Sequence, residues 1–219
     1  MKNILCFGDS NTYGYKPDGT GRYDFSVRYP GRLQAILGKE YHVIEEGCPG
    51  RTTVFEDKDY PYRKGIDYIT PCLQSHNPID YVVLMLGTND CKVSYRATNK
   101  EIAWGLAGIV EKIRTVSGKS TGIIIISPIH LGPNIGKPGY DPEFDSESVE
   151  VLKTLALAYR ELAQKADCDY LDASYVALAS PIDEEHLDEA GHNKLAMAVT
   201  EIIESIENRG RETRHSVVK

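Results

Sequence analysis

Five short apolar runs recur along the chain, and longer segments with helical spacing separate them. The helical segments, such as EIAWGLAGIVEKIRTV and VEVLKTLALAYRELAQKA, place apolar residues three and four positions apart. Such an alternation predicts a mostly parallel sheet with helices on both faces. The third and fourth runs are apolar almost throughout, as expected of strands that helices cover on both sides. We therefore predict a doubly wound α/β fold with five strands; the runs, which begin near residues 3, 41, 81, 122 and 169, are NILCF, YHVIEE, YVVLML, GIIIIS and DYLDA.

The length, net charge and cysteine content of the chain limit the classes of protein to which it can belong. With 219 residues and neither a linker nor a repeat, it suits one domain, which we place at residues 1–206, followed by a flexible polar tail at 207–219. The net charge of −7 disfavours nucleic acid or an anionic membrane as a partner. No run is long enough to span a membrane or to form a signal peptide. The five cysteines are scattered, as reduced thiols are, so we expect a cytoplasmic protein without metal or cofactor.

The first strand leads into the segment GDSNTYG, in which four polar residues follow a glycine. Ser10 should begin the turn into the first helix, where its hydroxyl is exposed and its N–H is free to face an anion. A helix cap formed by Asp9 or Ser10 explains the same residues, and these residues alone favour the cap.

Asp183 and His186 stand three residues apart, just before the last helical segment. A carboxylate and an imidazole at this spacing can face each other, so the carboxylate can hold one ring nitrogen while the other accepts a proton from a serine. A solvated acidic loop with a surface histidine is the alternative for these two residues taken alone.

Two more polar elements follow the second and third strands. Gly47 ends the second strand, where a glycine N–H can approach a ligand closely, and Asn89 follows the third, where its amide can donate to an oxyanion. Each also suits an ordinary turn. Because the carboxyl ends of parallel strands meet at one edge of the sheet, however, four such elements should converge there, and the functional interpretation is favoured.

The segments FGDSNTYG, EEGCPGRTT, LGTND and DEEH together resemble the four sequence blocks of the SGNH hydrolases, also called GDSL esterases, over residues 4 to 205. The second block is most similar to the arylesterase and acyltransferase branch. The resemblance implies a flavodoxin-like fold and a serine esterase with Ser10 as nucleophile, His186 as base and Asp183 as its partner. It also implies an oxyanion hole formed by the N–H groups of Ser10 and Gly47 and the side-chain amide of Asn89.

The resemblance further implies a small acyl-ester substrate and a homo-oligomer, since relatives in this branch often assemble. It does not identify the acyl group or the alcohol, nor whether hydrolysis or acyl transfer dominates. Asn11 stands where the family signature usually has leucine. Further candidates for site support or for the substrate pocket are Asp9, Asn11, Arg51 and His130, and the aromatic loop residues that could wall the pocket are Tyr15, Tyr60, Tyr62, Tyr140 and Phe144.

Two other functions are compatible with parts of the pattern. The loop GDSNTYG could bind a nucleotide or flavin phosphate without catalysis, although Asp9 places a negative charge there and no lysine follows it. A metal-dependent phosphoesterase could use Asp9, Asn89, Asp90, His186 and His192, but this sheet edge offers few carboxylates for a hard metal. We expect His192 to pack within the last helix or to cap it.

Overall fold

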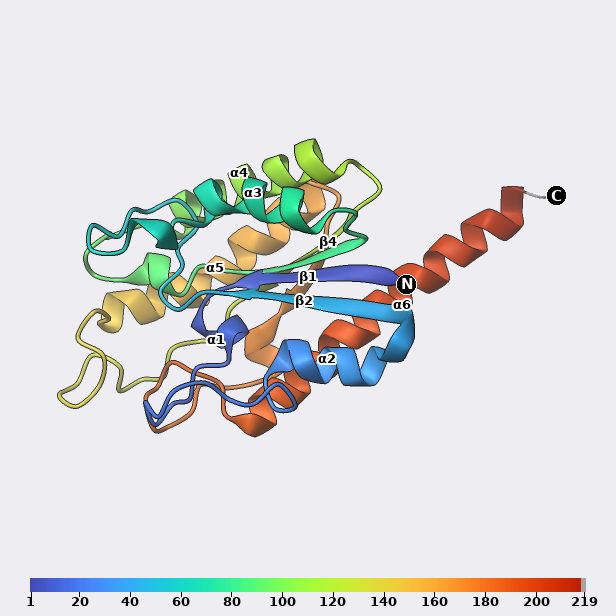
Figure 1. Cartoon of the computed structure of the whole chain (residues 1–219). Coiled ribbons are helices and arrows are strands. Elements are labelled where there is room, and N and C mark those ends of the chain that lie inside the picture. Colours follow the sequence, from blue (N-terminus) through green and yellow to red (C-terminus); the bar gives the residue numbers. More distant parts are fainter. Residues whose placement is uncertain (218–219) are drawn as a thin grey trace.

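The five apolar runs form the five strands of one sheet in the computed structural model, which describes the backbone of residues 1–217 and the side chains of residues 1–209 (Figure 1). Every strand pair is parallel, and the strand order is β2-β1-β3-β4-β5. The predicted doubly wound α/β fold is confirmed. The strands are β1 (Lys2–Gly8), β2 (Tyr41–Gly47), β3 (Tyr81–Met85), β4 (Gly122–Ser127) and β5 (Asp169–Asp172).

Within residues 1–217, six α-helices and four short 3-10 helices connect and flank these strands. Helix α4 begins with a capping box, in which the Thr98 hydroxyl accepts the Glu101 N–H and the Glu101 carboxylate accepts the Thr98 N–H. The α-helices are α1 (Ser10–Tyr13), α2 (Tyr29–Leu37), α3 (Gly65–His76), α4 (Asn99–Ser117), α5 (Ser146–Lys165) and α6 (Glu189–Val217). The 3-10 helices are η1 (Gly38–Glu40), η2 (Pro61–Arg63), η3 (Asn89–Cys91) and η4 (Ala173–Tyr175).

The strands divide the core into two layers, because successive side chains point to opposite faces of the sheet. Leu5 and Phe7 face the cluster that includes residues of α3, α4 and α5, whereas Ile4 and Cys6 face the cluster that includes residues of α2 and α6. The same helices lie on the two sides of the sheet in Figure 1. The fully covered sheet explains why β3 and β4 lack the polar alternation of a half-exposed strand.

The strand register brings the ends of β1, β2 and β3 together. Gly8 is level with Gly47 on one side and with Met85 on the other. A Cβ at Gly8 would lie 2.0 Å from the Thr12 Oγ1 and 2.6 Å from the Met85 carbonyl oxygen, so only glycine lets α1 fold back tightly here. The segments that leave these strands therefore start from one small area at the carboxyl edge of the sheet.

The end of the chain differs from the sequence-based expectation. Helix α6 continues to Val217, so residues 207–217 of the predicted flexible polar tail are helical; the flexibility of this segment stays a prediction, and residues 218–219 lie outside the described residues. Glu207 accepts hydrogen bonds from Lys2 and Tyr81, and Arg209 donates to the Asp169 carboxylate at 2.6 Å. The helix therefore keeps contact with the sheet past residue 206.

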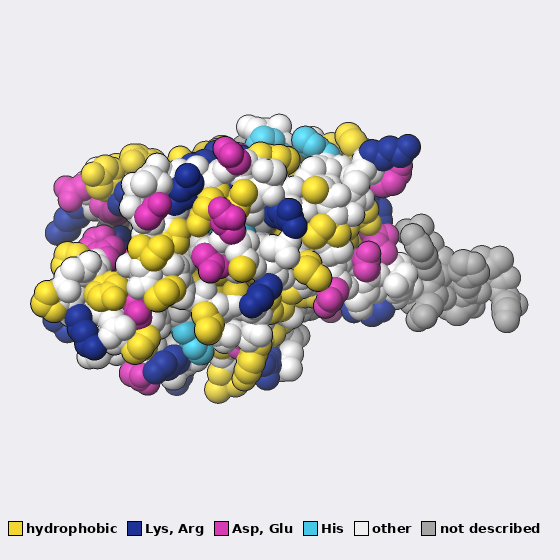
Figure 2. Space-filling model, turned by 90° about the horizontal axis from the view of Figure 1, so that it is seen from below, with side chains coloured by type: hydrophobic (Ala, Val, Ile, Leu, Met, Phe, Trp, Pro, Cys, Tyr) yellow, Lys and Arg dark blue, Asp and Glu magenta, His cyan; other side chains and the backbone are white. Residues whose placement is uncertain are grey.

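The outer surface carries charges of both signs. On the face seen in Figure 2, acidic and basic side chains alternate with apolar ones, and they do not gather into one large patch of a single sign. Within residues 1–217, no helix combines the length and the apolar character that crossing a bilayer requires.

Candidate active site

Ser10 lies where β1 passes into α1, and its position is fixed by a helix cap. Asp9 is the N-cap residue, and its Oδ1 accepts the Asn11 N–H at 3.0 Å. Ser10 is the first residue of the helix and is 5% exposed, and its hydroxyl lines a pocket. The sequence alone leaves open whether this segment caps the helix or presents a reactive serine. In the structure Asp9 caps the helix, and its neighbour Ser10 lines the pocket.

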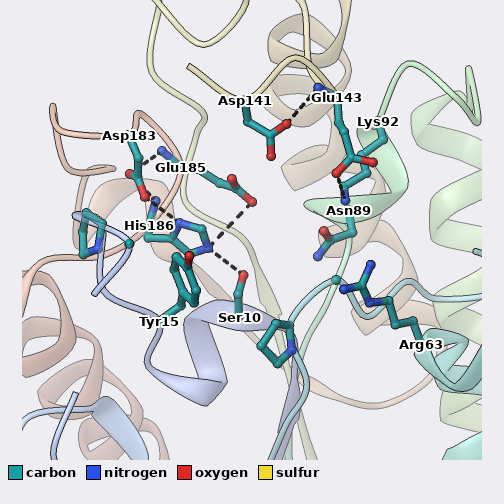
Figure 3. Close-up of a pocket in the computed structure, with 14 residues that line it drawn as sticks. Ser10, Tyr15, Arg63, Asn89, Lys92, Asp141, Glu143, Asp183, Glu185 and His186 are labelled. Carbon is teal, nitrogen blue, oxygen red and sulfur yellow. Dashed lines mark hydrogen bonds and ion pairs between the residues drawn. The ribbon is translucent and has the colours of Figure 1, made fainter. Parts of the chain in front are cut away.

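His186 completes a hydrogen-bonded row with Ser10 and Asp183 (Figure 3). The Ser10 Oγ lies 2.9 Å from the His186 Nε2, and the His186 Nδ1 lies 2.6 Å from the Asp183 Oδ2. Because a carboxylate can only accept, the proton between them belongs to Nδ1, and Nε2 is left to accept the serine proton. The other Asp183 oxygen accepts the backbone N–H of His186 at 3.0 Å, so the carboxylate holds both the ring and its backbone.

The surrounding charges suit His186 to take up a proton. Burial by itself would lower its pKa, but the hydrogen bond to Asp183 and the nearby Glu185 carboxylate outweigh burial and raise the pKa above the ordinary value. For the carboxyl group of Asp183, burial by itself would raise the pKa. The hydrogen bonds that it accepts from His186 outweigh burial and lower the pKa below the ordinary value. The pair therefore favours an imidazolium beside a carboxylate once a proton arrives.

Asn89 reaches the same pocket from η3, beyond the end of β3. Its Nδ2 donates to the Arg51 carbonyl oxygen at 3.3 Å, which leaves the second amide hydrogen available to a ligand. Asp90 ties this segment to the loop after β2, because its carboxylate accepts the Thr53 N–H at 2.9 Å and the Thr53 hydroxyl. Burial raises the pKa of Asp90 to about 7.

Gly47 does not line this pocket, and the glycine of the same loop that does is Gly50. A Cβ at Gly47 would lie 2.1 Å from the Tyr13 backbone nitrogen, so this glycine serves the close packing of β2 against α1. Gly50 has a φ of 79° and lies three residues further on. The expected place of Gly47 in the oxyanion hole is therefore corrected; the Pro-Gly pair, a turn signal, could have pointed to Gly50.

Two further sequence candidates lie outside the pocket. Arg51 is 4% exposed, its guanidinium donates to the Gly8 carbonyl at 3.0 Å and to the Glu46 carbonyl, and it stacks on the Phe7 ring at 4.2 Å. The contacts of Arg51 are those of a residue that supports the site, and it does not line the substrate pocket. His130, a candidate for the substrate pocket, lines a different hollow together with Arg160 and Tyr175 and is not among the residues that line the pocket beside Ser10.

Asn11 supports the site from beneath. Its Oδ1 accepts the Leu187 N–H at 2.9 Å, and its Nδ2 donates to the Glu185 carbonyl at 3.4 Å. These two backbone groups flank His186, so the Asn11 side chain joins the helix that carries Ser10 to the loop that carries the imidazole.

The pocket has a volume of about 310 Å³ and a charged lining. Among the aromatic candidates Tyr15 lines it, with its ring centre 4.8 Å from that of His186. The aromatic candidates that do not line it are Tyr60, Tyr62, Tyr140 and Phe144. The sequence interpretation missed the charged lining residues Arg63, Lys92, Asp141, Glu143 and Glu185. Among these five residues, only Glu185 could have been suspected from the sequence, because it stands directly before the histidine of DEEH.

The residues of the metal-dependent alternative are not all brought together. His192 is fully buried in α6, where its Nδ1 accepts the Tyr29 N–H at 3.3 Å, and burial lowers its pKa to about 4. It therefore packs within the helix, as expected. Among the described residues, the group of three or more side chains with ligand atoms close enough to share an ion is Glu46, Cys72 and His76, and none of these lines the pocket.

Comparisons with known proteins identify the family to which the chain belongs. The model of the GDSL-like Lipase/Acylhydrolase family matches residues 6–194. The structure of the M. smegmatis aryl esterase is similar with a TM-score of 0.87 and 34% identity, covering 94% of this chain and 99% of that one. A carbohydrate acetylesterase from Sinorhizobium meliloti is similar with a TM-score of 0.88 and 31% identity, covering 94% and 100%. No curated protein sequence matches the chain. The chain therefore belongs to the GDSL-like lipase/acylhydrolase family and is a carboxylic ester hydrolase.

Proposed function

We propose that the protein cleaves small carboxylic esters through an acyl-enzyme formed on Ser10. The observation that carries the proposal is the row from the Ser10 hydroxyl through His186 to Asp183, which lies at the wall of a pocket that also holds Asn89. The geometry of the row is that of a nucleophile, a base and a group that orients the base.

In the first half of the reaction, the Ser10 Oγ attacks the ester carbonyl carbon and its proton passes to the His186 Nε2. The tetrahedral intermediate then collapses, the bond to the alcohol oxygen breaks, and His186 returns the proton to that oxygen. In the second half, water attacks the acyl-enzyme, His186 takes the water proton, and Ser10 recovers it as the carboxylic acid leaves. An acceptor alcohol in place of water would give acyl transfer. Asp183 keeps Nδ1 protonated throughout.

The groups that would bind the oxyanion of the intermediate in this mechanism are the backbone N–H groups of Ser10 and Gly50 and the side-chain amide of Asn89. All three residues line the pocket. Ser10 is the first residue of α1, so its N–H has no partner within the helix, and the Gly50 N–H has no backbone partner among the described residues. Donors that are already oriented toward the developing charge lower the barrier without reorganisation.

The size of the pocket supports a short acyl group. Its volume of about 310 Å³ lies at the lower end of the range for small-molecule sites. The similar structures are named an aryl esterase and a carbohydrate acetylesterase, so acetyl esters are the first substrates to test. The phosphate-binding alternative has no comparable support, since the carboxylates that line the pocket beside Ser10 outnumber its two cations, Arg63 and Lys92.

A substitution at Ser10 with a matched control tests the proposal. Ser10→Ala should abolish hydrolysis of p-nitrophenyl acetate and labelling by a fluorophosphonate probe. Ser146→Ala removes an exposed hydroxyl at the start of α5 and should leave both unchanged. Parent activity in the Ser10 variant, or labelling of a serine other than Ser10, would contradict the mechanism.

A further inference from the structure

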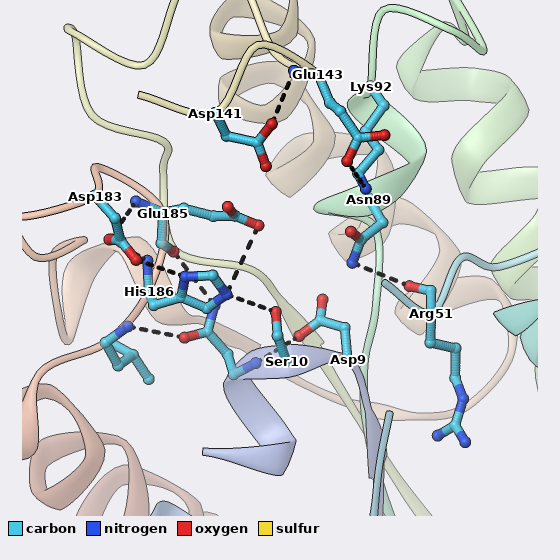
Figure 4. Close-up of polar contacts among 12 residues, drawn as sticks. Asp9, Ser10, Arg51, Asn89, Lys92, Asp141, Glu143, Asp183, Glu185 and His186 are labelled. Atoms are coloured by element: carbon cyan, nitrogen blue, oxygen red, sulfur yellow. Dashed lines mark hydrogen bonds and ion pairs between the residues drawn. The ribbon is translucent and has the colours of Figure 1, made fainter. Parts of the chain in front are cut away.

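Glu185 is a buried carboxylate that faces the pocket without a hydrogen-bond donor. The residue is 7% exposed, and its side chain points toward Ser10 and His186 (Figure 4). Among the described residues, no group donates a hydrogen bond to its carboxylate; its contact is with the His186 Nε2, 3.8 Å from its Oε1. Burying a carboxylate in this way is costly, and burial raises the pKa of Glu185 to about 7.

The backbone of Glu185 is held in place at the pocket wall. The Glu185 N–H donates to the Asp183 carboxylate at 3.1 Å, and its carbonyl accepts from the Asn11 amide at 3.4 Å. The residue thus belongs to the same short segment that fixes His186. A side chain that the fold holds in the pocket at such a cost indicates a ligand that offsets the cost.

The cations of the pocket are already paired with other carboxylates. The Lys92 ammonium lies 2.6 Å from the Glu143 carboxylate, and the Arg63 guanidinium lies 2.7 Å from that of Asp57. Lys92 acts on Glu185 from a distance, but it does not hydrogen-bond to it. A molecule that enters the pocket can therefore supply the hydrogen-bond donor that these cations do not give to Glu185.

The position of Glu185 indicates which part of the substrate would carry this donor. In the proposed mechanism, the His186 Nε2 protonates the departing alcohol oxygen, which then lies within about 3 Å of it. Glu185 lies beside that same nitrogen. A donor bound to Glu185 would consequently be only a few bonds from the ester oxygen, where the alcohol part of the substrate can carry it.

We propose, on the basis of the function above, that Glu185 selects esters whose alcohol part carries a hydroxyl or a protonated amine on the carbon next to the ester-bearing carbon. Such alcohols are vicinal diols, polyols and amino alcohols. A plain alkyl or aryl alcohol would enter the pocket but would leave the carboxylate without a donor. A group that binds a polar substituent rejects analogues without it, because its own polar atom then stays unpaired.

The test compares acetates that differ in this one group. 2-Hydroxyethyl acetate carries a neutral donor, protonated 2-(dimethylamino)ethyl acetate carries a charged donor, and 2-methoxyethyl acetate has a similar skeleton without a donor. The wild-type kcat/KM should be higher for one or both donor esters than for the methoxy ester. In Glu185→Leu this preference should fall by about 10-fold or more, the usual effect of losing a hydrogen bond to a charged group.

Glu185→Gln separates the two kinds of donor and guards against a misfolded leucine variant. Its amide oxygen still accepts from a hydroxyl, so a polyol preference should weaken only partly, whereas a preference for the charged amine should disappear. Glu189→Gln is the matched control, since it removes the same charge from the exposed first turn of α6.

Equal kcat/KM for donor and methoxy esters in the wild type would overturn the inference, and so would a preference that both Glu185 variants retain. In either case the esters would still be hydrolysed. Failure of the proposed function would look different, because no acetate would be cleaved by the wild type or cleavage would survive Ser10→Ala.

Discussion

Asn11→Leu tests how the fold positions the catalytic histidine. Asn11 is 3% exposed, and its Oδ1 accepts the Leu187 N–H at 2.9 Å. Leucine has the same branching and the same number of side-chain heavy atoms but no acceptor, so the variant would leave this buried N–H without a partner. The cost of an unsatisfied buried donor is about 1–3 kcal/mol. For a chain of this length, that loss lowers the melting temperature by roughly 2–12 °C.

The same change should slow catalysis. The Asn11 side chain bridges the helix of Ser10 and the backbone on both sides of His186, so its loss should let the imidazole shift away from the hydroxyl. A displacement of about 1 Å can cost on the order of 100-fold in rate, and we expect a decrease in kcat of about 10- to 100-fold with a smaller change in KM.

The assay is thermal unfolding together with steady-state hydrolysis of p-nitrophenyl acetate, measured well below the melting temperature of the variant. A lower melting temperature with full kcat would show that the bridge only stabilises the fold. A variant with the wild-type melting temperature and kcat would refute the reasoning altogether, because the hydrogen bond to Leu187 would then contribute nothing.

Three more predictions concern the site and the assembly. Asn89→Ala should lower kcat by about 10²–10³-fold if its amide binds the oxyanion, and unchanged kcat would exclude that role. His186 must be neutral to act as base, and its pKa is raised, so kcat/KM should fall as the pH decreases through a value above about 6.5. Asp183→Asn should move this fall in kcat/KM to lower pH. A fall at the same pH in the variant would contradict the assignment of Asp183. We also expect a homo-oligomer, so sedimentation velocity at micromolar concentration should give a species heavier than one chain, and a monomer would count against it.

The sequence by itself determined the elements and where the main site residues meet. Apolar periodicity is a local property, and the five runs became five parallel strands in the predicted places. Parallel strands end at one edge, so Ser10, Asn89 and the segment of His186 could be brought together without knowing any contact. The helical end of the chain was missed, because a polar segment with little periodicity gives no local signal.

Only the tertiary structure decided which loop side chains face the pocket. Gly47 and Gly50 are three residues apart, and their roles depend on the packing of β2 against α1. His130 follows a strand at the correct edge, yet it lines another hollow. Glu185 is polar and adjacent to His186. The sequence does not show that its carboxylate lacks a hydrogen-bond donor, because this depends on the ion pairs that Lys92 and Arg63 form with other carboxylates. Loop orientation is set by contacts between residues far apart in the chain, and sequence spacing does not encode those contacts.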